Sequence, residues 1–195
     1  MYAVSTSKRY HHGQLRETLI GLALDMLEGN GPEALTLRGL AQRAGVSGMA
    51  PYRHFADKSA LVAAVAEAGF EELRQRLLAV DDETDPKAAL VAFCVVYVGF
   101  ANDKPSLFRL MFGGAPPTAD ERLTDDRQTV FGLMATRIAQ LVPPSRRQDA
   151  LLASWSLAHG LAALLGSGRI RQPIADPGAL AARLAKLLLP GLQGR

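Results

Sequence analysis

The segment from Ser47 to Lys58, SGMAPYRHFADK, combines side chains that could hold a nucleic acid. A phenol hydroxyl, an imidazole and an ammonium group each bond phosphate oxygens, which makes Tyr52, His54 and Lys58 candidate phosphate contacts. Arg53 can reach a phosphate or a guanine. The residues ahead of these four are small or apolar, namely Ser47, Gly48, Met49 and Ala50. Such side chains permit close approach and contact with thymine methyl groups, so the segment predicts an element that lies against double-stranded DNA.

Charge is distributed unevenly along the chain, whose net charge of +3 is too small to identify a partner by itself. No acidic residue occurs from Met1 to Arg16, a stretch that carries Lys, Arg and His, or from Thr36 to Ala56, a stretch that carries Arg and His. This bias predicts a phosphate-facing surface.

The further candidate contacts belong to an N-terminal arm, which can follow the DNA backbone or enter the minor groove, and to a helix N-terminus, which attracts phosphate. They are Lys8, Arg9 and Arg16 in the arm, and Thr36 and Arg38 at the helix start.

Two helices are expected ahead of the basic segment. Apolar residues at helical spacing predict a first helix over about 13–28, which ends at the run Gly29-Asn30-Gly31. Thr36 is the expected N-cap of a second helix, and Gly45 ends that helix.

A third short helix is expected over the basic segment itself. Ser47 could cap it, and it would run to about His54. Pro51 would then fall in or just past the first turn, where a proline costs less. Two short helices joined by a glycine-containing turn make a helix-turn-helix, whose second helix lies in the major groove of DNA.

The rest of the chain predicts helices only. Six more are expected, with approximate limits 57–79, 86–103, 105–112, 119–141, 145–165 and 176–189. Asp57, Asp85 and Asp176 are expected to start three of these helices, and Pro86 is expected at the first helical position after Asp85. The chain shows no convincing strand alternation and no internal repeat. The predicted fold class is therefore all-α with about nine helices, arranged as a three-helix helix-turn-helix domain at 1–56 and a larger helical domain at 57–195.

Residues 11–61 resemble the N-terminal domain of the TetR family of transcriptional regulators. The matching features are the long first helix, the segment LTLRGLAQRAGVS, and YRHFADKSAL, which is similar to the family's Tyr-x-His-Phe-x-x-Lys-x-x-Leu signature. The resemblance implies phosphate contacts from Tyr52, His54 and Lys58, a core position for Phe55, and a capping Thr36 that also touches the DNA backbone. The segment WSLAHG, at 155–160, resembles the Trp-x-x-x-His-Gly motif in the C-terminal domain of one TetR subgroup.

The resemblance also implies what the helical body does, since this part of TetR regulators forms a homodimer and encloses a small-molecule pocket. The helix expected at 145–165 and the last helix are apolar over wide faces, and LAHGLAALLG contains small residues that allow close helix approach. Two such helices from each subunit could build a four-helix interface around a twofold axis. The alternative is that these faces belong to the core of one subunit.

Candidate effector-binding residues are large apolar side chains interspersed with a few polar groups. They are Phe93, Tyr97, Phe100, Phe108, Met111, Phe112, Met134, Trp155 and His159. Trp155 and His159 stand one helical turn apart, and the Trp N–H, the Tyr O–H and the His nitrogens could orient a ligand. The alternative for each of these residues is an ordinary core position.

Several function classes lack support in the sequence. There is no nucleophile motif, P-loop or dinucleotide fingerprint, so neither an enzyme nor a cofactor is expected. The pair His11-His12 has no carboxylate or cysteine nearby, so no metal site is expected. Cys94 is the single cysteine and fits an inert thiol in the reducing cytoplasm. The longest apolar run, 88–101, is shorter than the roughly 18 to 20 residues that cross a bilayer, and no signal peptide is recognised, so no membrane partner is expected.

These observations predict a homodimeric repressor that binds a double-stranded DNA operator and is released by a small, largely hydrophobic effector. The alternative is a helical small-molecule-binding protein or enzyme whose body does the main work. The acid-free stretch from Thr36 to Ala56, together with Lys58, favours the repressor, because an enzyme has no need for such residues beside a helix-turn-helix.

Overall fold

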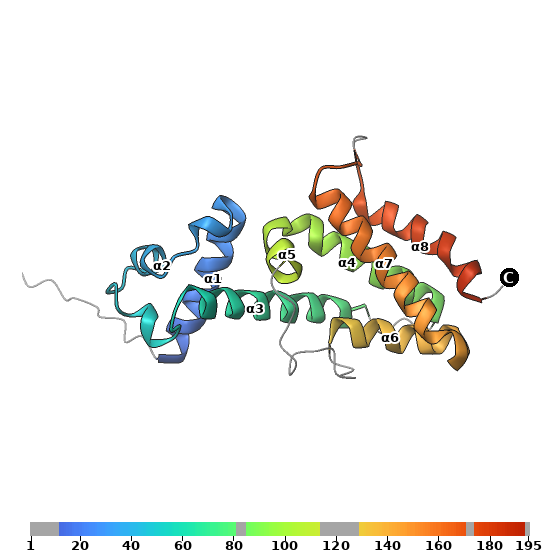
Figure 1. Ribbon diagram of the computed structural model, residues 1–195, viewed down its shortest axis with the longest axis horizontal. Coiled ribbons are helices and arrows are strands. Elements are labelled where there is room, and N and C mark those ends of the chain that lie inside the picture. Colours follow the sequence, from blue (N-terminus) through green and yellow to red (C-terminus); the bar gives the residue numbers. More distant parts are fainter. Residues whose placement is uncertain (1–11, 81–84, 114–128, 171–173, 194–195) are drawn as a thin grey trace, which may run out of the picture. The chain divides into compact units, whose positions relative to one another are not determined.

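The computed structural model describes residues 12–80, 85–113, 129–170 and 174–193. Within these ranges the chain forms eight α-helices, three short 3-10 helices and no strand, which confirms the all-α class (Figure 1). The α-helices are α1 (His12–Asn30), α2 (Leu37–Ala44), α3 (Lys58–Leu78), α4 (Pro86–Asp103), α5 (Pro105–Phe112), α6 (Val130–Leu141), α7 (Arg147–Gly166) and α8 (Pro177–Gln193). The 3-10 helices are η1 (Pro32–Ala34), η2 (Pro51–Arg53) and η3 (Pro144–Arg146).

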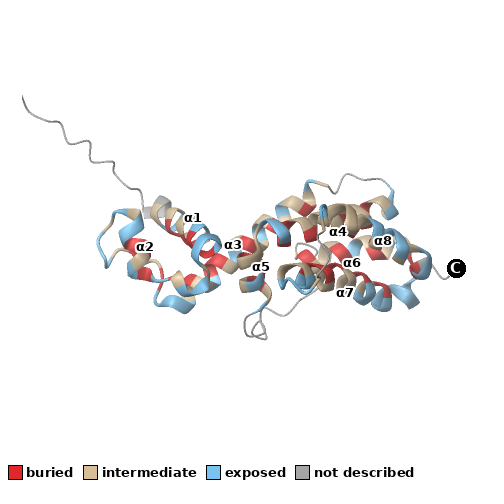
Figure 2. Cartoon of the chain, turned by 90° about the horizontal axis from the view of Figure 1, so that it is seen from above, coloured by how far each residue is buried: buried red, intermediate tan, exposed pale blue. Residues whose placement is uncertain are grey.

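The chain divides into two compact units, residues 1–68 and 69–195, and the division falls inside α3. Buried residues line the inward faces of the helices within each unit (Figure 2). The domain limits expected from the sequence, 1–56 and 57–195, remain a prediction, because compact units are not the same thing as functional domains.

Local signals in the N-terminal unit act as expected. The side chain of Thr36 caps α2 by accepting a hydrogen bond of 3.0 Å from the backbone N–H of Gly39. Gly45 ends α2 in the left-handed region, with φ at 66°, a conformation that costs glycine little. Asp57 caps α3 by accepting from the N–H of Ala60 at 2.8 Å. These contacts confirm the predicted helix starts at Thr36 and Asp57.

The third helix expected over 47–54 does not form as an α-helix. A turn covers 47–50 and is followed by the single 3-10 turn η2, so the described residues hold one α-helix fewer than the sequence predicted. The reason is Pro51: an α-helix would need an N–H at position 51 to bond the carbonyl of Ser47, and proline has none. The carbonyl of Ser47 instead accepts from Ala50 N–H at 2.9 Å, and the carbonyl of Pro51 accepts from His54 N–H at 2.9 Å.

In the C-terminal unit α4 is the central helix, and α6, α7 and α8 all pack against it (Figure 1). Asp85 caps α4 through Lys87 N–H at 3.0 Å, and Pro86 takes the first helical position, as predicted. Two stretches, α4 and residues 144–166, are long and apolar enough to cross a membrane by length and composition alone. For α4 the apolar run is explained by its place in the core. Cys94 lies there, and burial raises the pKa of its thiol to about 12.

Three helix limits differ from those expected. The helix predicted at 119–141 begins in the structure at Val130, capped by Thr129, while residues 119–128 lie outside the described ranges. The helix predicted at 145–165 is α7, preceded by η3. The last helix begins after the capping Asp176, as predicted, but continues past the expected end near Leu189 and through Pro190. A proline so close to a helix end removes only one hydrogen bond, so the final turn still forms.

Candidate functional site

The turn after α2 presents its polar and basic side chains to solvent. The exposed residues of the predicted DNA surface are Arg16, Thr36, Arg38, Ser47, Gly48, Met49, Tyr52, Arg53 and Lys58, while Ala50 and His54 are half-buried. Met49 is 68% exposed and Tyr52 45% exposed. Pro51 and Phe55 are buried beneath the turn and hold it against the core. The predicted Lys8 and Arg9 lie outside the described residues.

Positive charge on this turn is not neutralised by an ion pair with any described residue. Among the described residues, Arg38, Arg53 and Lys58 form no ion pair, since all four ion pairs found there join residues between Glu71 and Lys104. The guanidinium of Arg16 lies over the ring of Phe55, 5.7 Å from its centroid, so α1 adds a charge beside the anchor of the turn. Unpaired cations beside hydroxyl and imidazole groups form a surface that attracts phosphate.

Gly39 is a supporting residue that the sequence analysis missed. A β-carbon at this position would lie 2.8 Å from Thr36 Oγ1 and 3.4 Å from Met26 Cε. Glycine therefore leaves room for the threonine hydroxyl to cap α2. The cap holds the first turn of α2, where Arg38 also stands.

A cluster of aromatic rings occupies the C-terminal unit, with Tyr97 of α4 at its centre. Ring centroids of Phe93, Phe108 and Trp155 lie 6.1, 5.6 and 5.4 Å from that of Tyr97. The hydroxyl of Tyr97 is 2.9 Å from Nδ1 of His159, although the two residues are 62 positions apart. We call the following residues the aromatic cluster: Phe70, Phe93, Tyr97, Phe108, Phe112, Phe131, Trp155 and His159.

The structure thus brings together six of the nine predicted effector residues. Phe100, one of the others, lies under the guanidinium of Arg76, 5.2 Å from centroid to charge, and has no aromatic partner among the described residues. Met111 faces Gly69, and Met134 is fully buried on α6. Phe70 and Phe131 belong to the cluster but were not predicted, because their ring contacts join segments far apart in sequence.

The pKa values of Tyr97 and His159 are shifted by burial alone. Burial raises the pKa of Tyr97 far above its usual value, so the phenol stays protonated. Burial likewise lowers the pKa of His159, which favours the neutral imidazole. No charged group contributes to either shift.

The aromatic cluster connects to α3 through α5. Phe112 meets Phe70 edge to face, with centroids 5.2 Å apart. One residue earlier on each helix, Met111 faces Gly69, where a β-carbon would lie 2.7 Å from its sulfur. Because α3 is one continuous helix from Lys58 to Leu78, the residues that contact Phe112 and Met111 stand on the same helix as Lys58.

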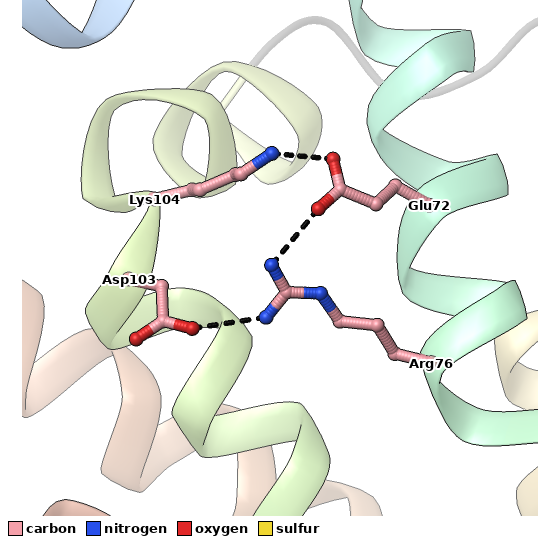
Figure 3. A network of polar contacts seen from close by, with 4 residues as sticks. All are labelled: Glu72, Arg76, Asp103 and Lys104. Carbon is pink, nitrogen blue, oxygen red and sulfur yellow. Dashed lines mark hydrogen bonds and ion pairs between the residues drawn. The ribbon is translucent and has the colours of Figure 1, made fainter. Parts of the chain in front are cut away.

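Four charged residues tie α3 to the junction of α4 and α5 (Figure 3). Arg76 bridges Glu72 and Asp103 at 2.9 Å each, and Lys104 pairs with the other oxygen of Glu72. Burial by itself raises the pKa of Glu72, but the hydrogen bonds from Lys104 and Arg76 outweigh it and leave that pKa below its usual value. This network is not predictable from the sequence, because only Glu72 and Arg76 carry a helical-spacing signal. All four side chains are partly exposed, so each pair is worth little to stability.

Two family profiles match the chain. The profile described as "Bacterial regulatory proteins, tetR family" matches residues 19–65, and the one described as "Tetracyclin repressor-like, C-terminal domain" matches residues 90–188. The Trp-x-x-x-His-Gly subgroup suggested by 155–160 is not confirmed by these matches.

Known proteins are similar to the chain over most of its length. Nucleoid occlusion factor SlmA of Vibrio vulnificus (strain YJ016) is 32% identical over 129 residues, which are 65% of this chain and 66% of SlmA. The chain therefore spans about two thirds of the length of this relative. A protein of unknown function from Rhodococcus sp. RHA1 superposes with a TM-score of 0.81 and is 29% identical in sequence. The match covers 96% of this chain and 100% of that protein. A TetR variant from Acinetobacter baumannii AYE, solved with minocycline, has a TM-score of 0.64 and 25% identity over 91% of this chain and 95% of its own.

Proposed function

Because the chain belongs to the TetR family of DNA-binding transcriptional regulators, we propose that it is a homodimeric repressor released from its operator by a small, largely hydrophobic effector. The observation that carries the proposal is the exposed, unpaired basic turn anchored by Phe55. The regulators of this family are not enzymes, which removes the enzyme part of the alternative drawn from the sequence. The family is soluble, and we place this member in the cytoplasm.

Operator binding by this turn would divide into two kinds of contact. Tyr52, His54 and Lys58 bond phosphate oxygens and position the protein, with Arg38 and Thr36 at the start of α2 doing the same. Met49 stands out from the turn and reads thymine methyl groups in the major groove. Lys8 and Arg9 extend the contact as an arm along the backbone or in the minor groove.

Dimerisation through α7 and α8 is supported by apolar residues that one subunit leaves uncovered. On α7, Ala153, Leu157, Gly160 and Leu164 share one face at helical spacing, and none of them is buried. On α8, Leu187 is 75% exposed and shares a face with Leu180 and Leu184. Only 28% of the apolar window in residues 144–166 is buried within the subunit, and a second copy of the chain would cover the rest.

Release would be a shift between two states of the dimer. Two recognition turns must lie about 34 to 36 Å apart, or a multiple of that, to enter successive major-groove faces. An effector in the aromatic cluster changes the packing of Phe112, and through Phe70 and Gly69 it changes the position of α3. The effector weakens operator binding only as far as it prefers the state with the wrong spacing.

The experiment is a gel-shift titration with DNA taken from the region upstream of the protein's own gene. The proposal predicts sequence-preferring binding at low salt, carried by a protein that sedimentation shows to be a dimer. Binding that makes no distinction between this DNA and a scrambled duplex would count against the repressor and favour a carrier.

A further inference from the structure

The hydrogen bond between Tyr97 and His159 determines which nitrogen of the imidazole carries the proton. Tyr97 is fully buried, and its only hydrogen-bond partner among the described residues is Nδ1 of His159. If Nδ1 were the donor, the phenol hydrogen would be buried without an acceptor, which is an expensive arrangement. Tyr97 therefore donates to Nδ1, and the neutral ring of His159 keeps its proton on Nε2.

The Nε2–H of His159 is a donor that the protein leaves without a partner among the described residues. The ring is half-buried, and the indole of Trp155 lies nearly parallel to it, at 6° and 6.0 Å between centroids. Phe112 and Phe131 are also half-buried, so the cluster reaches the surface of its unit at these rings. This edge offers aromatic surfaces together with a fixed N–H donor.

Among the described residues, no cation lies over a ring of the aromatic cluster and no ion pair includes a residue of the cluster. The two cation–ring contacts in the described residues lie on Phe55 and Phe100, outside the aromatic cluster. The described ion pairs involve only residues of α3 and of the α4–α5 junction. A charged ligand would lose its hydration here and would find no paired counter-charge among the described residues of the cluster, whereas an uncharged ligand needs none.

We infer that the effector is an uncharged ring compound with an oxygen acceptor, such as a ketone, which accepts a hydrogen bond from Nε2–H of His159 and packs against Trp155 and Phe112. This inference rests on the proposed effector-responsive function and narrows its ligand to one chemical class. Tyr97 is the positioning residue, since it holds the imidazole in the tautomer that donates.

The test compares four probes with one ring skeleton against the purified full-length protein by equilibrium dialysis. They are 2-acetylnaphthalene, which carries the acceptor; 2-isopropylnaphthalene, which has its shape without the acceptor; 2-naphthoate, an anion; and 1-(2-naphthyl)ethylammonium, a cation. The ketone should bind about fivefold or more tightly than the hydrocarbon, as expected for one hydrogen bond. Both charged probes should bind more weakly than the ketone. The inference is overturned if the hydrocarbon matches the ketone, if a charged probe exceeds it, or if none of the four binds.

Variants test whether His159 makes the distinction. His159→Phe should bring the affinity for the ketone down to that for the hydrocarbon, and leave the hydrocarbon within about twofold of wild type. Because this change leaves the Tyr97 hydroxyl unpartnered, the double variant Tyr97→Phe/His159→Phe, in which no polar group is stranded, is measured beside it. A ketone preference that persists in the folded double variant overturns the assignment.

The experiments distinguish a failure of this inference from a failure of the proposed repressor function. A protein that selects the ketone but binds no operator keeps the inference about the cluster and loses the repressor role. A protein that binds its operator but does not select among the probes overturns the inference alone.

Discussion

Gly69 of α3 and Met111 of α5 lie so close that a β-carbon at position 69 would stand 2.7 Å from the methionine sulfur. Leu107 is nearly as close, with its Cδ1 3.0 Å from the same point. The absence of a side chain at 69 is what lets the two helices meet, one residue away from the ring contact between Phe70 and Phe112. The aromatic cluster and α3 are therefore joined by direct packing.

This packing predicts a non-additive pair of substitutions. Alanine at 69 gains about 1 kcal/mol in helix propensity and costs about 1–3 kcal/mol in overpacking. In a Met111→Ala background the sulfur is gone, so Gly69→Ala should be at least about 1 kcal/mol more favourable there than in wild type. Urea unfolding of the four proteins, at one protein concentration, measures the difference. Additive effects would show that Met111 does not restrict position 69.

The lowered pKa of His159 predicts a loss of stability in weak acid. An unfolded histidine titrates near pH 6.5, so below about that pH the unfolded chain takes up a proton that the folded ring resists. The free energy of unfolding should therefore fall as the pH drops from 7.5 to 5.5. His159→Gln should lose less over that interval than wild type. Glu72, whose pKa is also lowered, titrates well below this range and cannot produce the effect. Equal losses in the two proteins would contradict burial of the neutral ring.

If Met49 contacts a thymine methyl group, the affinity for the operator should depend on that single methyl group. Replacing thymine by uracil at the contacted base removes that methyl and nothing else. Burial of one such group is worth about 0.8 kcal/mol, so operator affinity should fall about fourfold. Met49→Ala should bind the thymine and uracil operators almost equally, as fluorescence anisotropy would show. If no single thymine-to-uracil change lowers the affinity of wild type, Met49 does not read a methyl group.

If Lys58 contacts a phosphate, replacing it should change how DNA affinity depends on salt and should leave the sequence preference unchanged. Lys58→Ala should weaken binding to operator and scrambled DNA by a similar factor, and reduce the slope of log affinity against log salt by about 1. Lys87→Ala is the matched control, because Lys87 is an exposed lysine of the C-terminal unit and should leave the slope unchanged. An unaltered slope for the Lys58 variant would remove this residue from the phosphate contacts.

The features that the sequence predicted well are local ones. Thr36, Asp57, Asp85 and Asp176 were expected to start helices, and each accepts a hydrogen bond from a backbone N–H two or three residues on. Such caps depend only on neighbouring residues, so they can be read from a short stretch of chain. The all-α class follows from the same signals repeated along the chain.

The features that could not be predicted from the sequence depend on contacts between distant residues, or on a small difference in free energy between two local structures. A proline is tolerated in the first turn of a helix, so Pro51 did not exclude one. An α-helix that starts at Ser47, however, needs a backbone N–H at position 51, and proline has none. The bridge from Arg76 to Asp103 joins residues 27 positions apart, and no local pattern marks it. Phe70 and Phe131 enter the aromatic cluster for the same reason, through packing that only the folded chain brings about.

Native mass spectrometry of the protein with its upstream DNA shows whether two copies of the basic turn hold one duplex. We expect two chains, or a multiple of two, on each operator duplex. We also expect Leu187→Glu, which places a charge on the exposed face of α8, to reduce both the complex and the free dimer. One chain bound stably to each duplex, or no complex at low salt, would contradict the proposal that two copies hold one duplex.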